Sequence, residues 1–297
     1  MCCDGGVTYD SDPGSLRAVA EQLATEAAGF VRRRRTEVFG VGSTQDEAAS
    51  AVRAKSTPTD PVTVVDTETE RLLRDRLAEL RPGDPIVGEE EGGSVVGHHG
   101  RPTWVLDPID GTVNFVYDIE AYAVSVGVQI DGRSVAGAVA NVPTGEVFSA
   151  AVGAGALLRR GGVSTPLRCN PIVELSMALV GTGFGYSPER RRRQAEVLTR
   201  LLPEVRDVRR IGSCALDLCM VAAGRLDAYY ELGVNVWDWA AGALIAEEAG
   251  AVMSLPPIAG GEGNDGGRPI VAAAPGIAKE FDEALGRAGA VSGSAGD

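Results

Sequence analysis

The strongest chemical signal in this sequence is a pair of aspartates, Asp107 and Asp110, which follow an apolar run and flank Pro108. Proline favours a turn, so both carboxylates are expected close together where a strand ends. Gly111 and Thr112 come next, at a predicted helix start whose first backbone N–H groups lack partners within the helix. Carboxylate oxygens bind hard divalent cations, and free amides at a helix start bind phosphate. This segment could therefore hold a metal ion and a phosphate group side by side.

Aspartates are also common in turns and helix caps, so a purely structural role is the alternative interpretation. Two further acidic segments weigh against it. The run Glu89–Glu91 follows an apolar segment, and Asp238 lies at a predicted helix cap between two tryptophans. Each segment alone is ordinary surface or cap chemistry, but the three together form a known pattern.

The order of these segments resembles the inositol monophosphatase family, within the lithium-sensitive, metal-dependent phosphatases that include fructose-1,6-bisphosphatases. The two family signatures resemble residues 104–128 and 237–251. The other landmarks also match in order, at residues 55–66, 88–90, 212–213 and 227–231. The resemblance covers roughly residues 15–288.

The resemblance implies two catalytic magnesium ions, with a weaker third ion as a further option. The implied ligands are Glu90, Asp107, the carbonyl of Ile109, Asp110, Asp238 and, for the third ion or for a link to Lys55, Asp66. Two such ions ~3.5–4 Å apart neutralise a phosphate, activate water and stabilise the departing alkoxide. A histidine or cysteine nucleophile is then unnecessary.

The resemblance also implies how the phosphate, the attacking water and the substrate are held. Gly111 and Thr112 would hold the phosphate, and Thr112 with Glu90 would orient the water. Asp60 is implied to be the hydrogen-bond partner behind Thr112. The implied substrate contacts are Glu231, which binds ring hydroxyls, together with Cys214 and Lys55.

Composition bounds these hypotheses. The net charge of −13 repels nucleic acid, anionic lipid and phosphorylated molecules, so bound cations must reverse the field locally. The five cysteines contain no CxxC pair, which argues against a zinc site and a disulfide framework and favours reduced thiols. Without an apolar run of ~20 residues, a membrane span is not expected. We expect a cytoplasmic protein.

The elements that must position these residues follow from hydrophobic spacing and turn signals. In the first half we expect a helix from Asp12 that ends at Arg32–Arg35, where the arginines suit the helix dipole. A surface loop over 40–61, a helix over 67–80 and a loop over 92–102 with solvated His98 and His99 should follow. Antiparallel strands are then expected over 103–106, 121–130, 133–142 and 146–151. Asp131-Gly132 indicates a hairpin between two of these strands.

The second half alternates between strand and helix. We expect strands over 177–181, 205–209 and 226–230, helices over 188–202, 213–223 and 237–249, a glycine-rich loop over 256–268, and a last strand and helix.

These elements predict a layered α/β fold, an αβαβα sandwich of the sugar-phosphatase and fructose-1,6-bisphosphatase type. We expect a single domain over 12–297, with an α+β half at about 12–170, an α/β half at about 171–290, and flexible ends at 1–11 and 292–297. The resemblance further implies a homodimer and inhibition by lithium.

The favoured function is magnesium-dependent hydrolysis of a phosphate monoester, with myo-inositol 1-phosphate as the first substrate. Rival enzyme activities are fructose-1,6-bisphosphatase, histidinol-phosphatase and nucleotide 3′-phosphatase. Some bacterial relatives look like accessory factors that bind RNA or the transcription machinery, and Arg190–Arg193 with Arg206, Arg209 and Arg210 could form a basic patch. The net charge argues instead for a solvated helix face. A cation-binding module without phosphatase activity is a third alternative.

Overall fold

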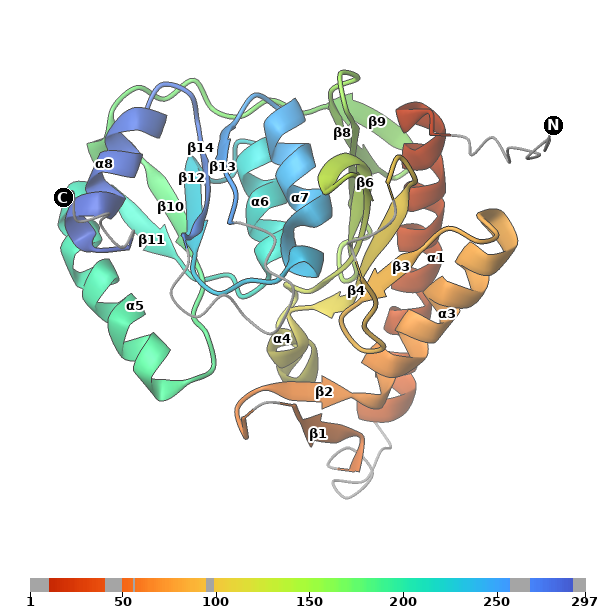
Figure 1. Ribbon diagram of the computed structural model, residues 1–297. Coiled ribbons are helices and arrows are strands. Elements are labelled where there is room, and N and C mark those ends of the chain that lie inside the picture. The colour runs from red at the N-terminus through yellow and green to blue at the C-terminus, as the bar shows by residue number, and fades with distance from the viewer. Residues whose placement is uncertain (1–10, 41–49, 56, 95–98, 257–267, 291–297) are drawn as a thin grey trace.

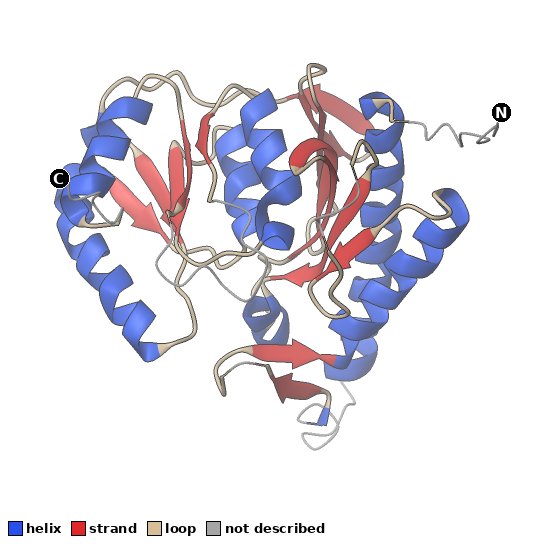
Figure 2. Cartoon of the chain, in the orientation of Figure 1, coloured by secondary structure: helices blue, strands red, loops and turns tan. Residues whose placement is uncertain are grey.

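The computed structural model describes residues 11–40, 50–55, 57–94, 99–256 and 268–290. These residues form a seven-stranded, a five-stranded and a two-stranded sheet. Figure 1 shows helices α1 and α3 outside the larger sheet, α6 and α7 between the two larger sheets, and α5 and α8 outside the smaller one. Figure 2 shows the same alternation of helical and sheet layers by colour. The predicted αβαβα sandwich is thus confirmed.

The first half contains the seven-stranded sheet, in the order β3-β4-β5-β6-β7-β8-β9, and the small β1-β2 sheet. β3 is parallel to β4, and the remaining neighbours in the larger sheet are antiparallel. The elements are α1 (Pro13–Phe39), β1 (Val52–Ala54), β2 (Pro61–Thr63), α3 (Val64–Leu80), β3 (Ile86–Gly88), β4 (Thr103–Asp110), α4 (Thr112–Tyr117), β5 (Ala123–Ile130), β6 (Arg133–Asn141), β7 (Val147–Ala151), β8 (Ala156–Arg160) and β9 (Val163–Pro166).

The second half contains the five-stranded sheet, in the order β11-β10-β12-β14-β13. β10 is parallel to β11 and β12, whereas β14 is antiparallel to both of its neighbours. The elements are η1 (Leu175–Met177), β10 (Leu179–Thr182), α5 (Pro188–Leu201), η2 (Leu202–Glu204), β11 (Asp207–Arg209), α6 (Cys214–Ala222), β12 (Ala228–Glu231), α7 (Val236–Glu248), β13 (Val252–Ser254), β14 (Ile270–Ala273) and α8 (Ala278–Ala288).

The N-terminal helix begins as predicted, with the Asp12 carboxylate accepting a hydrogen bond from the Ser15 amide. Its end was predicted wrongly, because α1 continues to Phe39 and its last turn contains no basic residue. The arginines make specific contacts instead of interacting with the helix dipole. For example, Arg32 donates to the Val142 carbonyl and Arg35 to the Phe115 carbonyl.

The segment predicted as a loop over 40–61 contains a hairpin among its described residues. β1 and β2 pair antiparallel, with Ala54 opposite Pro61. Lys55 follows β1 directly, so the hairpin places its ammonium group. The next helix begins at Val64, earlier than predicted, because Thr63 and Asp66 form a capping box.

The middle helix α7 lies unusually close to the larger sheet. A Cβ atom on Gly127 of β5 would lie 2.8 Å from the Cβ of Ala240, and one on Gly137 of β6 would lie 2.9 Å from the Cα of Ala241. Only glycine permits this approach without a shift of the backbone or its neighbours. The contact brings the start of α7, with Asp238, towards β4.

Smaller predictions have mixed outcomes. The Asp131-Gly132 hairpin is confirmed, and both residues have positive φ, 49° and 76°. β8 and β9 were not predicted. His99 is exposed as expected. His98 and the loop residues 257–267 lie outside the described residues, as do residues 1–10 and 292–297 of the predicted flexible ends (1–11 and 292–297).

Candidate active site

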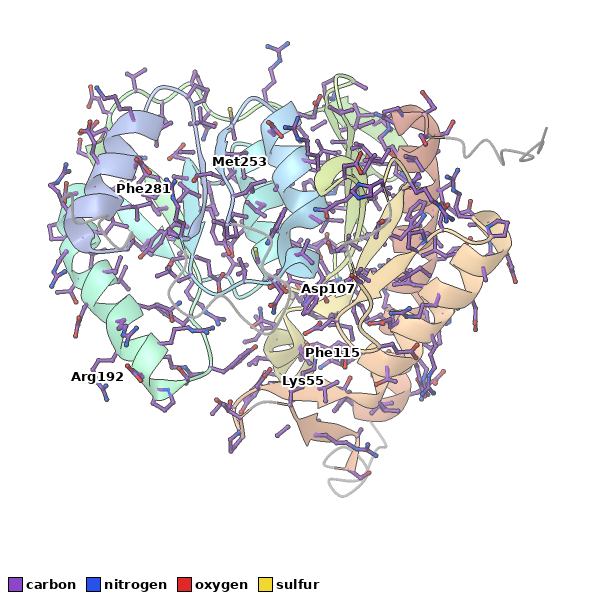
Figure 3. All side chains as sticks on the ribbon, in the orientation of Figure 1. Lys55, Asp107, Phe115, Arg192, Met253 and Phe281 are labelled. Atoms are coloured by element: carbon purple, nitrogen blue, oxygen red, sulfur yellow. The ribbon has the colours of Figure 1, made fainter. Side chains whose placement is uncertain are left out.

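The pair of aspartates is brought together by a bulge in β4. The register of β4 on β5 shifts between Asp107 and Asp110, so Pro108 interrupts the ladder without ending the strand. Asp238, at the start of α7, completes the group: one carboxylate oxygen from each of the three residues lies within 4.8 Å of the others. Figure 3 shows Asp107 where β4 and α7 lie next to each other. The predicted convergence of these carboxylates is therefore present.

Each of the three carboxylates has one oxygen held by the protein. Asp107 Oδ1 accepts from the Ile109 amide at 3.0 Å, and Asp238 Oδ2 accepts from the Asn235 amide at 2.5 Å. The residue that caps α7 is Asn235, and Asp238 is its capping-box partner in the first turn. In both residues the second oxygen accepts no hydrogen bond from the residues that the structure describes, so it can face a ligand.

Asp110 ties this group to the second half of the chain. Its Oδ2 accepts from the Ser213 hydroxyl and from the Ala215 amide, both at 2.6 Å. Ser213 caps α6, so the start of that helix orients the carboxylate. The sequence matched Gly212-Ser213 to the family without giving Ser213 a role. Its hydroxyl is a contact that the sequence reasoning missed.

Electrostatics favour a cation between these groups. Burial raises the pKa of Asp107 well above its usual range, and the charges of Glu89, Asp110 and Asp238 raise it further. Burial also raises the pKa of Asp110 to about 7, although the bonds from Ser213 and Ala215 oppose the shift. Close, buried carboxylates repel one another, and a divalent cation offsets that repulsion. The oxygen-only donor set fits Mg²⁺.

The two neighbouring glutamates differ in how their charges act on the aspartates, and the role of Glu90 as a metal ligand stays a prediction. Glu89 raises the pKa of Asp107 and Asp238 through its charge, whereas Glu90 is not among the main influences on either residue. Lys55 donates to both glutamates, at 2.7 Å to Glu89 and 2.5 Å to Glu90. Burial acts to lower the pKa of Lys55, but the glutamates outweigh it and raise that pKa. The glutamate whose charge acts on the aspartates is therefore Glu89.

The partner of Thr112 is Asp66. The Thr112 hydroxyl lies 3.0 Å from Asp66 Oδ1 and 3.0 Å from the Ile109 carbonyl. Asp66 thus occupies the position that we predicted for Asp60, and the prediction for Asp60 was wrong. Asp66 also accepts from the amide and hydroxyl of Thr63, so its contacts are to threonines. Asp66 was also predicted as a possible link to Lys55, but the Lys55 ammonium group contacts Glu89 and Glu90.

Two of the predicted substrate contacts, Cys214 and Glu231, lie in the second half of the chain. The Tyr229 hydroxyl donates to Glu231 Oε2 and also interacts electrostatically with the buried Cys214 thiol. Burial raises the pKa of Glu231. Gly111, on the metal side, precedes α4 as its N-terminal cap. Cys214 and Glu231 are thus brought together by Tyr229, which the sequence analysis did not include in the site.

A protein-family model described as the inositol monophosphatase family matches residues 12–287 of this chain. This chain belongs to the inositol monophosphatase family. Membership implies dependence on a divalent metal, Mg²⁺, which the three carboxylates of Asp107, Asp110 and Asp238 can accommodate. Within the described residues, no helix is long and apolar enough to cross a membrane.

Similar proteins agree with this family. The inositol-1-monophosphatase SuhB of Mycobacterium tuberculosis (strain ATCC 25618 / H37Rv) is 64% identical over 282 residues, covering 94% of this chain and 96% of that protein. The solved structure of Mycobacterium tuberculosis SuhB superposes with a TM-score of 0.79 at 58% identity, covering 95% of this chain and 100% of that one. The Nus factor SuhB of Vibrio cholerae is 39% identical, covering 66% of this chain and 72% of that protein.

Proposed function

We propose that this inositol monophosphatase hydrolyses inositol 1-phosphate to inositol and inorganic phosphate with Mg²⁺. The observation that carries this proposal is the 64% identity to curated inositol-1-monophosphatases over 94% of the chain, joined to the three converging aspartates. Divalent cations at this site supply a charge that neutralises the phosphate, acidifies water and stabilises the leaving alkoxide.

We assign two cations per chain to overlapping sets of oxygens. Glu89, Asp107 and the Ile109 carbonyl would hold one, and Asp107, Asp110 and Asp238 would hold the other. We propose Glu89 beside the sequence-predicted Glu90, because the charge of Glu89 raises the pKa of Asp107 and Asp238. Asp66 remains a candidate for a weaker third ion, because it is fully buried and its pKa is raised by burial to about 7.

Thr112 positions the attacking water. Its one hydroxyl hydrogen points at Asp66 or at the Ile109 carbonyl. When the Ile109 carbonyl is engaged as a ligand, the hydrogen goes to Asp66. The oxygen of Thr112 can then accept a hydrogen bond from the water, whose proton moves towards the Thr112–Asp66 pair as oxygen attacks phosphorus. The amides of Gly111 and Thr112 would bind the phosphate oxygens.

Glu231 is assigned to recognition of the substrate alcohol. Tyr229 engages Oε2 of its carboxylate, so Oε1 is the oxygen that a ring hydroxyl would reach. Cys214 borders the same network through its contact with Tyr229. Inhibition by lithium and assembly as a homodimer remain predictions from the family.

A phosphate-release panel tests the function. The purified protein is assayed with Mg²⁺ on inositol 1-phosphate, fructose 1,6-bisphosphate, histidinol phosphate and a nucleoside 3′-phosphate. We expect the highest kcat/KM on inositol 1-phosphate and loss of release in EDTA. A higher value on another substrate would reassign the activity, and release that persists in EDTA would contradict the metal-dependent mechanism.

A second function is suggested by the similarity to the Nus factor SuhB of Vibrio cholerae. Arg191–Arg193 of α5 and Arg206, Arg209 and Arg210 are exposed. A salt-dependent shift of an RNA probe would support RNA binding, and its absence at low salt would exclude binding of that probe.

A further inference from the structure

A buried carboxylate outside the candidate site grips the loop that carries the acidic run. Glu70 of α3 is 0% exposed. Its Oε2 accepts from the Glu90 amide at 2.7 Å, and its Oε1 accepts from the Glu91 amide at 3.0 Å. A charged acceptor strengthens both bonds, and burial removes competition from water. The backbone of the loop is thus held at two consecutive residues.

Arg74, one helical turn after Glu70, holds the far end of the same loop. Its Nε donates to Glu70 Oε1 at 2.9 Å, and its Nη2 donates to the Gly92 carbonyl at 2.8 Å. Gly92 in turn exchanges backbone hydrogen bonds with Gly88, at 3.0 and 3.1 Å. Residues 88–92 therefore form a closed loop in which α3 binds the amides of Glu90 and Glu91 and the carbonyl of Gly92.

The close fit explains the glycine that begins the loop. A Cβ atom on Gly88 would lie 2.1 Å from Glu70 Oε1. Any other residue there would displace the carboxylate from the amides. Glu70 also opposes the ionisation of Glu90, because it adds a like charge nearby. A negative group placed beside other acids is unfavourable by itself, so its contribution must come from the hydrogen bonds that it makes.

We propose that Glu70 and Arg74 form an outer clasp that fixes the directions of Glu89 and Glu90 and thereby sets the affinity for Mg²⁺. The inference rests on the proposed function, because it takes this loop as part of the metal site. Neither residue contacts substrate or metal; both are positioning residues. α3 then supports the site twice, since Asp66 on the same helix contacts Thr112.

The test is Mg²⁺ binding measured by calorimetry on wild-type protein and on Glu70→Gln. The amide keeps the shape but cannot accept from both backbone N–H groups and from Arg74. Outer partners of metal ligands typically contribute about 10–100-fold to metal affinity. We therefore expect the Mg²⁺ dissociation constant to rise by at least ~10-fold. We also expect kcat at saturating Mg²⁺ to change much less than the Mg²⁺ concentration for half-maximal rate.

Glu68→Gln is the matched control. Glu68 lies on the same helix, but its carboxylate pairs with Arg34, at 2.7 and 3.0 Å. The same change of charge should leave Mg²⁺ affinity unaltered there. An equal loss of affinity in both variants would overturn the clasp, because it would trace the effect to net charge alone.

A second variant keeps the inference testable if Glu70→Gln fails to fold. Arg74→Gln releases the Gly92 carbonyl and should also weaken Mg²⁺ binding. Wild-type affinity in a folded Glu70→Gln or Arg74→Gln protein would refute the clasp and leave the proposed function standing. Failure of the wild-type protein to bind Mg²⁺ would instead refute the proposed function and the clasp with it.

Discussion

The two sides of the candidate site hold their acidic groups in different ways. On the side of the larger sheet, Asp107 and Asp110 each accept a hydrogen bond from a backbone amide. On the side of the smaller sheet, Asp217 of α6 is 1% exposed. Neither oxygen of Asp217 has a hydrogen-bond partner among the described residues, and burial raises its pKa well above the usual range.

The two sides differ in whether backbone amides stabilise the charge of their carboxylates. Amide donors favour the ionised form of a carboxyl group, so the metal side is built to hold charged oxygens once a cation is present. Burial without such donors favours the neutral form of a carboxyl group. The raised pKa of Asp217 therefore favours its neutral form, whereas at Asp110 the bonds from Ser213 and Ala215 oppose the rise in pKa that burial causes.

The largest expected effect comes from a change on the metal side. Asp110→Asn should reduce kcat/KM on every substrate by more than the ~10–100-fold typical of outer partners, because it removes a direct ligand. The fold should persist, since the amide oxygen can still accept from Ser213 and Ala215. Phosphate release and thermal unfolding measure the two quantities. Activity within ~10-fold of wild type would remove Asp110 from the metal site.

The metal side was the part of the site most open to prediction from sequence. Asp107, Asp110, Gly111 and Thr112 are neighbours in the chain, so a local pattern of strand, bulge and helix start already places them together. Asp238 was also found, because it lies between two tryptophans at a predicted helix cap, in the segment that resembles the second family signature. The layers of the fold followed from the change from antiparallel strands to strand and helix alternation.

The rest depends on contacts between distant segments. Glu89 and Glu90 are adjacent and chemically identical, and their directions are decided by a loop that Glu70 and Arg74 hold. Asp66 and Asp60 are both plausible partners for Thr112 on sequence alone. Asp66 is the observed partner because the capping box starts α3 at Val64 and turns its first buried face towards α4. Hydrophobic periodicity predicts neither the directions of the two glutamates nor the choice of Asp66 as the partner of Thr112.

The second-largest effect is expected at Thr112 and Asp66, the hydrogen-bonded pair that we propose positions the attacking water. Thr112→Ala should lower kcat by about 100-fold, the lower end for a general-base contact, with a smaller change in KM. Thr112→Ser keeps the hydroxyl and should retain most of the rate. Asp66→Asn should be more harmful than Asp60→Asn in the same assay. The reverse order would restore Asp60 as the partner of Thr112.

A smaller effect is expected on the recognition side. Glu231→Gln should lower kcat/KM for inositol 1-phosphate by about 10-fold relative to p-nitrophenyl phosphate, which lacks ring hydroxyls. A hydrogen bond to a charged group is worth about 1.5–3 kcal/mol, so losing the charge on this acceptor alters the ratio and not the chemistry. The measurement is the ratio of the two kcat/KM values. An equal loss on both substrates would place Glu231 on the metal side of the comparison.

The smallest effect on activity is expected away from both sides, where Arg225 joins the halves of the chain. Its Nη1 and Nη2 donate to the 3% exposed Glu146, at 2.9 and 2.5 Å. Arg225→Met should leave kcat/KM within about 2-fold but reduce the free energy of unfolding by about 1–3 kcal/mol, the usual penalty for an unsatisfied buried acceptor. Arg160, 3.9 Å from Glu146, should moderate the loss.

The pH dependence identifies the cause of that loss. The hydrogen bond from Arg225 lowers the pKa of Glu146, so the pair stabilises the fold fully above the ordinary glutamate pKa. This contribution disappears as the pH falls through the lowered pKa. The stability difference between Arg225→Met and wild type, measured by urea unfolding, should therefore shrink as the pH falls below the ordinary glutamate pKa, from about pH 5 towards about pH 3. A difference that stays constant over this range would mean that Arg225 acts through its packing on Phe148, where its guanidinium lies 5.6 Å from the ring centre, and not through its charge.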